Sequence, residues 1–273
     1  MIVSRTKAEL RAALATLPGT KALVMTMGAL HEGHLTLVAE ARRRAEHVIV
    51  SIYVNPLQFG PNEDFDSYPR DLERDLAMLG EVDLVFAPSD AEMYPREPLV
   101  RIDPGPVATI LEGATRPTHF AGVLQVVAKV MIAVGPDVAI FGQKDAQQLA
   151  LVSTMVEDLD LGVEIVAAPI ARDEDGVARS SRNAYLSPGE RVQARALSQA
   201  LRAGQAESGP SEALAAAREV LENAPGVRLD YLVLVDPITF TELHPGAERG
   251  LLAVAAWVGT TRLIDNAIVT LRS

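Results

Sequence analysis

The chain has 273 residues, of which 48% are hydrophobic and 22% charged, a composition typical of a globular protein with a buried core. Its 36 acidic and 25 basic residues give a formal net charge of −11. This balance argues against a nucleic-acid groove but leaves open a local cluster of positive charge that binds one nucleotide. The sequence has no cysteine, which excludes a disulfide framework, a thiolate metal site and a catalytic thiol.

The sequence shows no export signal and no segment able to cross a bilayer. The N-terminus meets charge at once, at Arg5 and Lys7, and lacks an apolar run before a small-residue cleavage site. The most apolar stretch, residues 120–134, is interrupted by Gln125 and Lys129 and is too short to span a membrane. We therefore expect a soluble, cytoplasmic protein with neither a membrane nor a nucleic-acid partner.

The first 170 residues alternate short apolar runs with helical patterns. The capping box Thr6-Lys7-Ala8-Glu9 predicts a helix that ends at Pro18-Gly19. Further helices are expected over residues 33–46, 68–79, 120–134 and 144–159, and strands over residues 21–27, 48–54, 82–86, 137–141 and 163–168. This alternation predicts an α/β fold, a Rossmann-like parallel sheet domain over residues 1–170 that binds ligands beyond the carboxyl ends of its strands.

The pattern changes near Pro169. A polar segment, residues 171–183, is followed by two helical patterns and then by three strand-like runs. The helices are expected over residues 188–203 and 211–223, and the strands over residues 228–235, 251–257 and 261–271. Helices followed by several strands predict a smaller α+β domain over residues 171–273.

The sharpest motif is Met27-Gly28-Ala29-Leu30-His31-Glu32-Gly33-His34, directly after the first long strand. Gly28 and Gly33 let the backbone approach a ligand, and the following helix aims its N–H groups and its positive dipole end at an anion. His31 and His34 lie three residues apart and add hydrogen-bond donors on one face of the turn. The motif indicates a phosphate site without a P-loop.

The histidine pair also has two plainer interpretations, an ordinary helix cap and a pair of metal ligands. A zinc-protease pair requires positions i and i+4 with a glutamate beside the first histidine, whereas this pair lies at i and i+3 with Gly33 between. Only His47, His119 and His244 remain as further histidine ligands. The strand–turn–helix setting favours phosphate over metal.

Two further clusters offer contacts to phosphate. Phe141-Gly142-Gln143-Lys144-Asp145 repeats the order of strand, glycine and helix start, and Gln147 and Gln148 follow one turn later. Lys144 suits a point-charge contact with phosphate, although taken alone a solvated pair of Lys144 and Asp145 is favoured. Arg179-Ser180-Ser181-Arg182-Asn183 offers hydroxyls, N–H groups and a guanidinium to phosphate oxygens, or is a surface turn.

Neutral and basic groups occupy two other loops. Residues 55–61 follow the strand expected over residues 48–54, at the end of the sheet where a ligand is expected. Gln58 in this loop can hydrogen-bond a hydroxyl or a carboxylate and set specificity, unless the segment is only a Pro-rich connection. Arg116 and His119 open the long apolar helix and suit either anion binding or helix capping.

At these residues the chain resembles the pantothenate synthetases (pantoate–β-alanine ligases), which belong among the nucleotidyltransferases with a histidine-rich ATP signature. The matching blocks, in order along nearly the whole chain, are residues 27–34, 51–59, 68–70, 112–123, 141–148, 175–186 and 261–266. The resemblance implies a two-step reaction in vitamin B5 and coenzyme A biosynthesis. The carboxylate of (R)-pantoate attacks the α-phosphate of ATP and releases pyrophosphate, and the amine of β-alanine then displaces AMP from pantoyl adenylate to give pantothenate.

The resemblance also implies roles for individual residues. His34 is then the general acid, while His31 and Lys144 stabilise charge on the phosphate oxygens. Gln58 holds pantoate and β-alanine, and Gln148 holds pantoate. The implied ATP contacts are Met27, Gly28, Ala29, Leu30, His31, Glu32, Gly33, His34, Gly142, Gln143, Lys144, Asp145, Ala171, Arg179, Ser180, Ser181 and Arg182.

Mg²⁺ on the phosphates of ATP is implied as well, with Asp75 near its acidic contact, together with a homodimer. The C-terminal domain, joined near Ala171 and carrying Ser180, Ser181 and Arg182, is expected to act as a lid that closes over ATP. The chain departs from the family pattern at several positions. Arg179 stands where Met or Leu is usual, Thr118 where Gly is usual, Gln125 where Thr is usual, and Arg74 where an acidic residue is more common. None of these departures removes a proposed catalytic side chain. The guanidinium of Arg179 either adds a phosphate contact or leaves that contact to the backbone alone.

Two other functions are compatible with parts of the pattern. Another adenylyl- or cytidylyltransferase of the same superfamily would act on a phosphorylated substrate, for which Arg or Lys would be favoured in place of Gln58 and Gln148. A non-catalytic nucleotide-binding or scaffold protein would be expected to have lost the histidine pair or Lys144, and both are present.

Overall fold

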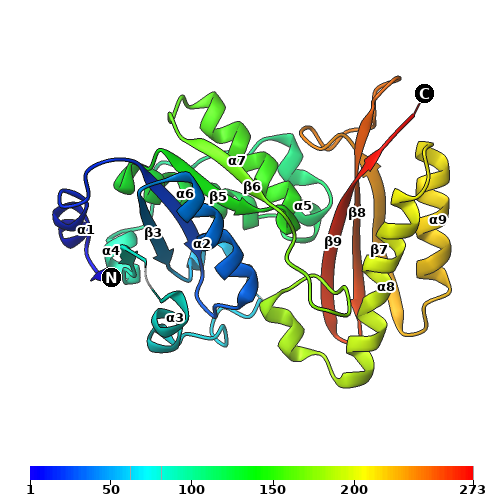
Figure 1. Ribbon diagram of the computed structural model, residues 1–273, viewed down its shortest axis with the longest axis horizontal. Helices are drawn as coiled ribbons and strands as arrows, with labels where there is room; N and C mark the ends of the chain where they lie inside the picture. The colour runs from blue at the N-terminus through cyan, green and yellow to red at the C-terminus, as the bar shows by residue number, and fades with distance from the viewer. Residues whose placement is uncertain (62, 81, 273) are drawn as a thin grey trace. The chain divides into compact units, whose positions relative to one another are not determined.

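The structure is a computed structural model that describes residues 1–61, 63–80 and 82–272, and its chain divides into two compact units (Figure 1). Unit 1 comprises Met1–Gly142 and Gln147–Ala168, and unit 2 comprises Gln143–Ala146 and Pro169–Ser273. The short turn at residues 143–146 therefore belongs to unit 2, although its neighbours on both sides in the chain belong to unit 1.

Unit 1 is built on a parallel sheet with the strand order β1-β4-β3-β2-β5-β6. The strands are β1 (Ile2–Ser4), β2 (Lys21–Thr26), β3 (His47–Ile52), β4 (Leu84–Phe86), β5 (Val138–Gly142) and β6 (Glu164–Ala168). β2 pairs with β3 on one side and with β5 on the other, so the chain reverses its direction across the sheet between β2 and β5. In a doubly wound sheet, ligands bind at the carboxyl ends of the two strands on either side of such a reversal.

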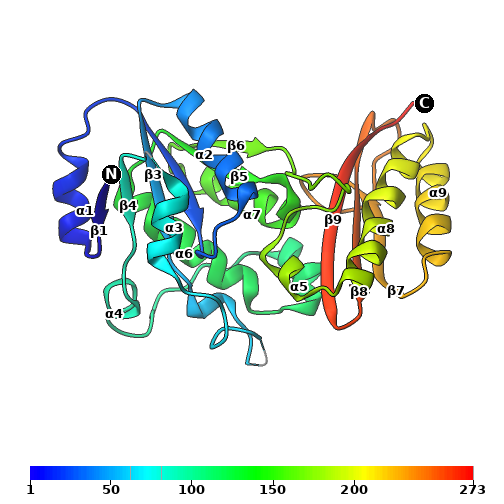
Figure 2. The ribbon, with the colours of Figure 1, turned by 60° about the horizontal axis from the view of Figure 1, so that its bottom comes forward.

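Helices pack on both faces of this sheet (Figure 2). One face, which contains Leu23 and Ile49, packs against α1 (Lys7–Leu14), α6 (His119–Val134) and α7 (Ala146–Asp158). The other face, which contains Val24 and Val50, packs against α2 (Glu32–Arg44) and α3 (Leu72–Leu79). Shorter elements complete unit 1: η1 (Pro56–Gln58), α4 (Asp90–Met93), η2 (Pro106–Thr109) and α5 (Glu112–Thr115). Because helices cover both faces of the sheet, side chains on both sides of its central strands are buried. The sequences of these strands are therefore continuous apolar runs.

Unit 2 packs two helices on an antiparallel sheet with the strand order β7-β8-β9. Its elements are η3 (Gln143–Asp145), η4 (Ser181–Tyr185), α8 (Pro188–Gln205), α9 (Pro210–Glu222), β7 (Val227–Val235), β8 (Arg249–Val258) and β9 (Thr261–Thr270). Leu252 and Leu263 lie on the sheet face that the helices cover, with Leu201 of α8 and Leu221 of α9. An isolated antiparallel bridge between residues 172 and 178 folds the polar segment back on itself before α8.

The predicted fold class, a Rossmann-like parallel sheet domain followed by a smaller α+β domain, is confirmed. The sequence did not predict β1, α4 or α5, because three or four residues carry no readable periodicity. The helix expected from residue 68 begins at Leu72, because the side chain of Asp71 accepts the N–H of Arg74 and caps the helix there. The helix expected from residue 144 begins instead with the 3-10 turn η3, and α7 follows from Ala146.

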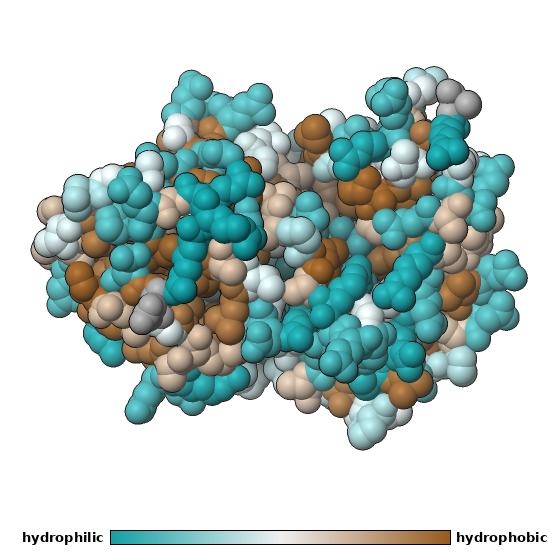
Figure 3. Space-filling view, viewed as in Figure 1, coloured by the Kyte–Doolittle hydropathy of each residue, from teal (hydrophilic) through white to brown (hydrophobic). Residues whose placement is uncertain are grey.

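Hydrophilic side chains predominate on the face of the molecule shown in Figure 3, where hydrophobic residues are scattered singly or in small groups.

The apolar helix α6 has 16 residues and packs into the core of unit 1. Within the described part of the chain, no helix combines the length and the apolar character needed to cross a bilayer.

Candidate active site

The loop after β2 carries the histidine motif and turns sharply before α2 begins. Gly28 and Ala29 have positive φ angles of 79° and 50°, a conformation that glycine adopts readily and alanine rarely. The hydroxyl of Thr26 accepts the N–H of Gly28 at 3.2 Å and donates to the carbonyl of Ser51 in β3, also at 3.2 Å. The turn is therefore tied to the end of the sheet before the chain reaches His31.

The carboxylate of Asp75, in α3, holds the same turn. This side chain is 1% exposed, and it accepts the N–H of Ala29 on Oδ2 at 3.0 Å and the N–H of Leu30 on Oδ1 at 2.8 Å. A Cβ at position 28 would lie 2.8 Å from the same Oδ2, so the turn requires Gly28. Arg74 donates to the carbonyl of Leu30 at 3.3 Å and lies 3.8 Å from Asp75. Asp75 thus satisfies two backbone donors and stabilises an unusual backbone conformation.

His31 and His34 cap the first turn of α2 with their Nδ1 atoms. Nδ1 of His31 accepts the N–H of Gly33 at 3.1 Å, and Nδ1 of His34 accepts the N–H of His31 at 3.3 Å. The ring centroids are 4.1 Å apart, and the ring planes are tilted by 36°. A histidine whose Nδ1 accepts a hydrogen bond is neutral and carries its proton on Nε2. The helix-cap interpretation of the pair therefore holds for the Nδ1 atoms. The same geometry puts the ring proton on Nε2, so that Nε2 of each ring is a hydrogen-bond donor.

The other residues of the motif differ in burial. Leu30 is buried with Val38 in the core of unit 1, and its N–H and carbonyl contact Asp75 and Arg74. Glu32 is exposed at the start of α2. The side chain of Leu30 thus anchors the loop, and ATP contacts by Met27, Gly28, Ala29, Leu30, Glu32 and Gly33 stay predictions.

Gln58, in η1, lies beside the histidine loop. Its side chain is 7% exposed; Nε2 donates to the sulfur of Met27 at 2.9 Å, and Oε1 accepts from Asn55 at 3.2 Å. Asn55 is 1% exposed, donates to the carbonyl of Gly122 in α6 at 3.0 Å and accepts from the hydroxyl of Tyr94 at 3.0 Å. Sequence reasoning missed Asn55, for which the available signal was its place just after β3, at the carboxyl end of a parallel strand.

Arg116 and His119 hold the main chain of Gln58. The carbonyl of Gln58 accepts from Nδ1 of His119 at 2.9 Å and from Arg116 at 3.3 Å, and Arg116 also donates to Nε2 of His119 at 3.1 Å. Arg116 forms a two-point ion pair with Glu63, in which Nε lies 2.8 Å from Oε1. Burial raises the pKa of Glu63, but the hydrogen bonds and charge of Arg116 outweigh it and hold that pKa below its ordinary value. Positioning of Gln58 is a role that neither interpretation from the sequence included.

Gln148, the predicted pantoate contact, lies half-buried on the first turn of α7. Its neighbour Gln147 is buried and donates to the carbonyls of Val107 at 2.6 Å and Ile110 at 2.9 Å. The side-chain oxygen of Gln147 accepts the N–H of Glu112 at 3.1 Å. Gln147 therefore holds the segment before α5, and the substrate role of Gln148 stays a prediction.

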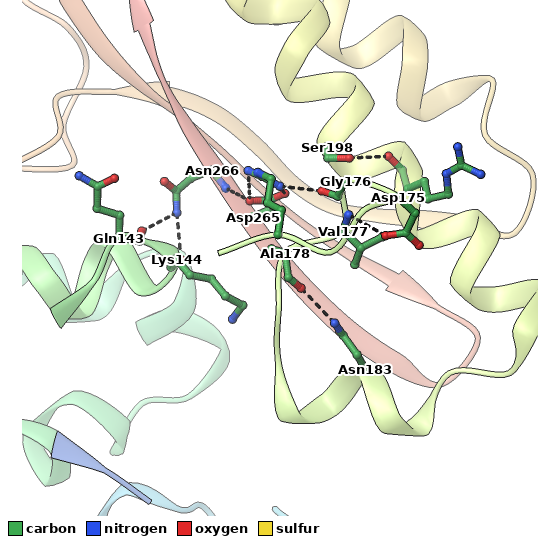
Figure 4. A network of polar contacts seen from close by, with 12 residues as sticks. Gln143, Lys144, Asp175, Gly176, Val177, Ala178, Asn183, Ser198, Asp265 and Asn266 are labelled. Carbon is green, nitrogen blue, oxygen red and sulfur yellow. Dashed lines mark hydrogen bonds and ion pairs between the residues drawn. The ribbon is translucent and has the colours of Figure 1, made fainter. Parts of the chain in front are cut away.

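In unit 2, Lys144 lies in η3, and its Nζ is 3.9 Å from a carboxylate oxygen of the exposed Asp145. This contact is long for an ion pair and is worth little at the surface. The side-chain amide of Asn266, in β9, donates to the carbonyls of both Gln143 and Lys144 at 2.9 Å (Figure 4). The main chain around Lys144 is therefore held by Asn266, which the sequence did not single out.

The polar segment of unit 2 holds Arg179 through two contacts. The N–H of Arg179 donates to the carbonyl of Ala171 at 2.9 Å, and its Nε lies 2.9 Å from Oδ1 of Asp173. Arg191 pairs with Asp173 at 2.6 Å and with Asp175 at 2.8 Å, and this hydrogen bonding lowers the pKa of Asp175. The guanidinium of Arg179 thus binds a carboxylate of its own unit, which favours a backbone-only contact with phosphate.

The serines that follow open η4. The hydroxyl of Ser180 accepts the N–H of Arg182 at 3.3 Å and caps this turn. Asn183 donates to the carbonyl of Ala178 at 3.0 Å, and its Oδ1 is buried with no hydrogen-bond partner among the described residues. Ser180, Ser181 and Arg182 therefore lie together in one short turn, whose contacts with ATP stay predictions.

The predicted site residues fall into two groups, one in each unit. Unit 1 contains Met27, Gly28, Ala29, Leu30, His31, Glu32, Gly33, His34, Gln58, Asp75, Gly142 and Gln148. Unit 2 contains Gln143, Lys144, Asp145, Ala171, Arg179, Ser180, Ser181 and Arg182. Within unit 1 the structure brings the histidine loop into contact with both Asp75 and Gln58.

The donor set does not fit a magnesium centre built from protein ligands. Both oxygens of Asp75, the predicted metal contact, accept backbone N–H groups, and Arg74 lies beside them. Among the residues that the structure describes, no three or more His, Cys, Asp or Glu side chains form a group that could hold a metal ion. A metal contact by Asp75 stays a prediction.

Comparison with known proteins gives a consistent result. The family model for pantoate-beta-alanine ligase matches residues 2–268. The chain is 56% identical to the pantothenate synthetase of Thermobifida fusca (strain YX), over 99% of this chain and 96% of that protein. It is also 56% identical to the pantothenate synthetase of Acidothermus cellulolyticus, over 97% of this chain and 90% of that protein.

Two solved structures are similar to this chain along nearly its whole length. The crystal structure of pantothenate synthetase from Thermus thermophilus has a TM-score of 0.92 and 48% identity, with 98% of this chain and 99% of that chain covered. The pantoate-beta-alanine ligase from Francisella tularensis, complexed with beta-gamma ATP and beta-alanine, has a TM-score of 0.81 and 34% identity, with 98% and 97% covered. The chain belongs to the pantoate–β-alanine ligase family.

Proposed function

We propose that this protein condenses (R)-pantoate with β-alanine to form pantothenate, consuming ATP and releasing AMP and pyrophosphate. The observation that carries the proposal is the contact between Gln58 and Met27. It places an uncharged amide, able to bind hydroxyl and carboxylate groups, against the loop whose histidines can bind phosphate. The near full-length similarity to pantothenate synthetases supports this assignment.

In the first step, a carboxylate oxygen of pantoate attacks the α-phosphorus of ATP. The bond between that phosphorus and the bridging oxygen breaks, and pyrophosphate leaves with the electron pair. The Nε2–H groups of His31 and His34 donate to phosphate oxygens on which charge develops, and Lys144 adds a positive charge. Because the carboxylate is already ionised, the attack needs no proton transfer. Since pantoate itself is the nucleophile, pantoyl adenylate forms without a covalent enzyme intermediate.

We propose that His34 acts as a hydrogen-bond donor rather than as a general acid. Its Nδ1 accepts the N–H of His31, so the ring is neutral in this conformation. A general acid would need a proton on Nδ1 as well, and that proton would break the cap of α2. Donation without proton transfer is sufficient to stabilise the developing charge, an effect worth about 100- to 1,000-fold in rate.

In the second step, the amine of β-alanine attacks the carbonyl carbon of pantoyl adenylate. The amine reacts in its neutral form; the carbon–oxygen bond to the phosphate breaks, AMP leaves with the electron pair, and the nitrogen gives up one proton to solvent as the amide forms. We assign Gln58 to pantoate and β-alanine and Gln148 to pantoate. Asn55 and His119 hold Gln58 in place by its side chain and its carbonyl, respectively.

We propose three further points by analogy with the family. Mg²⁺ enters as the metal complex of the phosphates of ATP. The protein works in the cytoplasm and as a homodimer.

The test is pyrophosphate release from ATP and Mg²⁺ with (R)-pantoate, in the presence and absence of β-alanine. Pantoate alone should give a burst of about one pyrophosphate per active site, and AMP and pantothenate should accumulate only when both substrates are present. Pyrophosphate release that requires a phosphorylated acceptor instead of pantoate would indicate a nucleotidyltransferase and contradict the proposal.

A further inference from the structure

The turn that carries Lys144 is held by a side chain of β9. Nδ2 of Asn266 donates to the carbonyl of Gln143 and to that of Lys144, both at 2.9 Å, and the side chain is 6% exposed (Figure 4). Asparagine suits this position because one nitrogen offers two hydrogens, whereas aspartate would place a negative charge against two carbonyl oxygens. The main chain at Lys144 is therefore fixed by two hydrogen bonds from one buried amide.

Asn266 is held in turn by its neighbour, Asp265. The N–H of Asn266 donates to Oδ1 of Asp265 at 2.8 Å. Asp265 is 3% exposed, and its two oxygens pair with the guanidinium of Arg172 at 2.6 and 2.9 Å. Arg172 also donates to the carbonyl of Gly176 at 3.0 Å. Two-point pairing of a buried carboxylate with arginine is strong and geometrically specific, so Asp265 ties β9 firmly to the polar segment.

Asp265 and Asn266 hold different segments because successive residues of a strand point to opposite faces of the sheet. Figure 4 shows Asn266 directed toward η3 and Asp265 directed toward the segment that contains Gly176. That segment folds back through the bridge between residues 172 and 178 and then enters η4, where Ser180 caps the turn. One dipeptide of β9 thus anchors both segments that carry the predicted phosphate contacts of unit 2.

We propose that Asn266 is a positioning residue for adenylate formation, acting through the backbone of Lys144. Its partner Asp265 performs the corresponding task for the segment that carries Ser180, Ser181 and Arg182. The inference rests on the proposed function, because it assigns Asn266 to the step in which Lys144 meets the α-phosphate. It adds that β9 of unit 2 holds the main chain at this lysine, although β5 directly precedes the turn in the chain.

The first test replaces Asn266 and measures pyrophosphate release with saturating pantoate. Asn266→Ala removes both hydrogen bonds, and kcat should fall by about 30- to 100-fold while KM for ATP changes by less than about 3-fold, because a misplaced charge is felt most in the transition state. Asn266→Asp keeps the shape of the side chain but repels the two carbonyls, so its kcat should fall at least as far. An unchanged kcat in both variants would overturn the proposal.

Gln205→Ala is the matched control. Gln205, in α8, also donates from a side-chain amide to a main-chain carbonyl, that of Ile268 in β9, at 2.9 Å. Its removal breaks the same kind of bond in the same unit without touching η3. Its kcat should remain within about 2-fold of the wild-type value, since a surface change away from the site has little effect. An equal loss in both variants would indicate general destabilisation of unit 2 and overturn the proposal.

A double-mutant cycle tests whether Asn266 acts through Lys144. If it does, Asn266→Ala should cost less than about 3-fold in kcat in a protein that already carries Lys144→Ala, because the group being positioned is gone. Full additivity of the two losses would contradict the proposal. A Lys144→Ala protein with unchanged kcat would reject the role of Lys144, and this inference with it, while leaving the ligase activity intact.

A final measurement does not depend on catalysis. The backbone amides of residues 143–146 should exchange hydrogen at least about 10-fold faster in Asn266→Ala than in the wild type or in Gln205→Ala, with α9 unchanged in all three. Equal exchange rates would overturn the proposal even if activity were lost. Faster exchange confined to this turn, together with the loss of kcat, is the result that the proposal requires.

Discussion

The histidine loop of unit 1 and the Lys144 turn of unit 2 both follow a strand of the same parallel sheet, yet they are held in place differently. In the histidine loop, His31 precedes α2 and His34 lies in its first turn, and both cap this helix within three positions of the chain. The carbonyls of the Lys144 turn are bound instead by Asn266, 122 positions away from Lys144. A phosphate-binding turn can therefore be fixed by its own sequence or by a remote strand.

The two turns contain side chains that take part in the proposed reaction, and other side chains hold those turns in position. His31, His34 and Lys144 offer donors or charge, and each lies in a motif that the sequence displays. Asp75 and Asn266 contribute no group to the proposed reaction, and each acts by satisfying two backbone groups of such a motif. Loss of a positioning residue should therefore reduce activity less than loss of a residue that donates a hydrogen bond or a charge to ATP.

The largest effect is expected for His34→Ala, which removes the Nε2 donor together with the Nδ1 cap. The kcat for pyrophosphate release should fall by about 100- to 1,000-fold. His34→Gln keeps a donor but cannot transfer a proton, so it should recover part of this loss if donation is what matters. His244→Ala, at an exposed histidine whose Nδ1 contacts the carbonyl of Pro245, is the control and should be unchanged. A His34→Gln protein as slow as His34→Ala would favour proton transfer.

Among the changes in unit 1, Asp75→Asn should have the next largest effect, because an amide offers one acceptor oxygen to the two N–H groups of Ala29 and Leu30. The free energy of unfolding should fall by about 1–3 kcal/mol, and kcat/KM for ATP by about 10-fold. The Mg²⁺ concentration for half-maximal activity should not change if Asp75 only positions the loop. Glu73→Gln, at an exposed residue of α3, is the control; an increased Mg²⁺ requirement specific to Asp75→Asn would support a metal contact instead.

Glu63→Gln is expected to have a smaller effect, a loss of about 0.5–1 kcal/mol in the free energy of unfolding near neutral pH. The pKa of Glu63 is lowered in the folded state, so its contribution is complete above the ordinary glutamate pKa of about 4.3 and is lost as the pH falls through the lower folded value. Denaturation of the wild type and the variant from neutral to acidic pH should show the difference shrinking. A difference that grows on acidification would contradict the ion pair with Arg116.

Arg179→Met should have the smallest effect, because Asp173 keeps its contact with Arg191. We expect KM for ATP to change by less than about 3-fold and the free energy of unfolding by less than about 1 kcal/mol. Nucleotide titration of the two proteins checks this. A rise of about 10-fold or more in KM for ATP would show that the guanidinium binds phosphate, a contact of the charge-assisted kind.

The parts of the molecule that the sequence predicted are those governed by local patterns. The alternation of strands and helices and the histidine motif at the start of α2 depend on spacing within a few residues. Both were therefore predictable from the sequence. The hydrogen bonds of Asp75 to the loop and of Asn266 to η3 join residues far apart in the chain, and no periodicity encodes such pairs. The place of the Lys144 turn in unit 2 depends on a long-range contact of the same kind.

The most direct test of the adenylate mechanism traces the carboxylate oxygens of pantoate into the products. (R)-Pantoate labelled with ¹⁸O in both carboxylate oxygens is converted with ATP and β-alanine, and the label in AMP and pantothenate is measured by mass spectrometry. If the carboxylate attacks the α-phosphorus, each AMP should carry one ¹⁸O and each pantothenate should keep one in its new amide carbonyl. Unlabelled AMP, with the label in phosphate or pyrophosphate, would contradict the adenylate mechanism and the roles assigned to both turns.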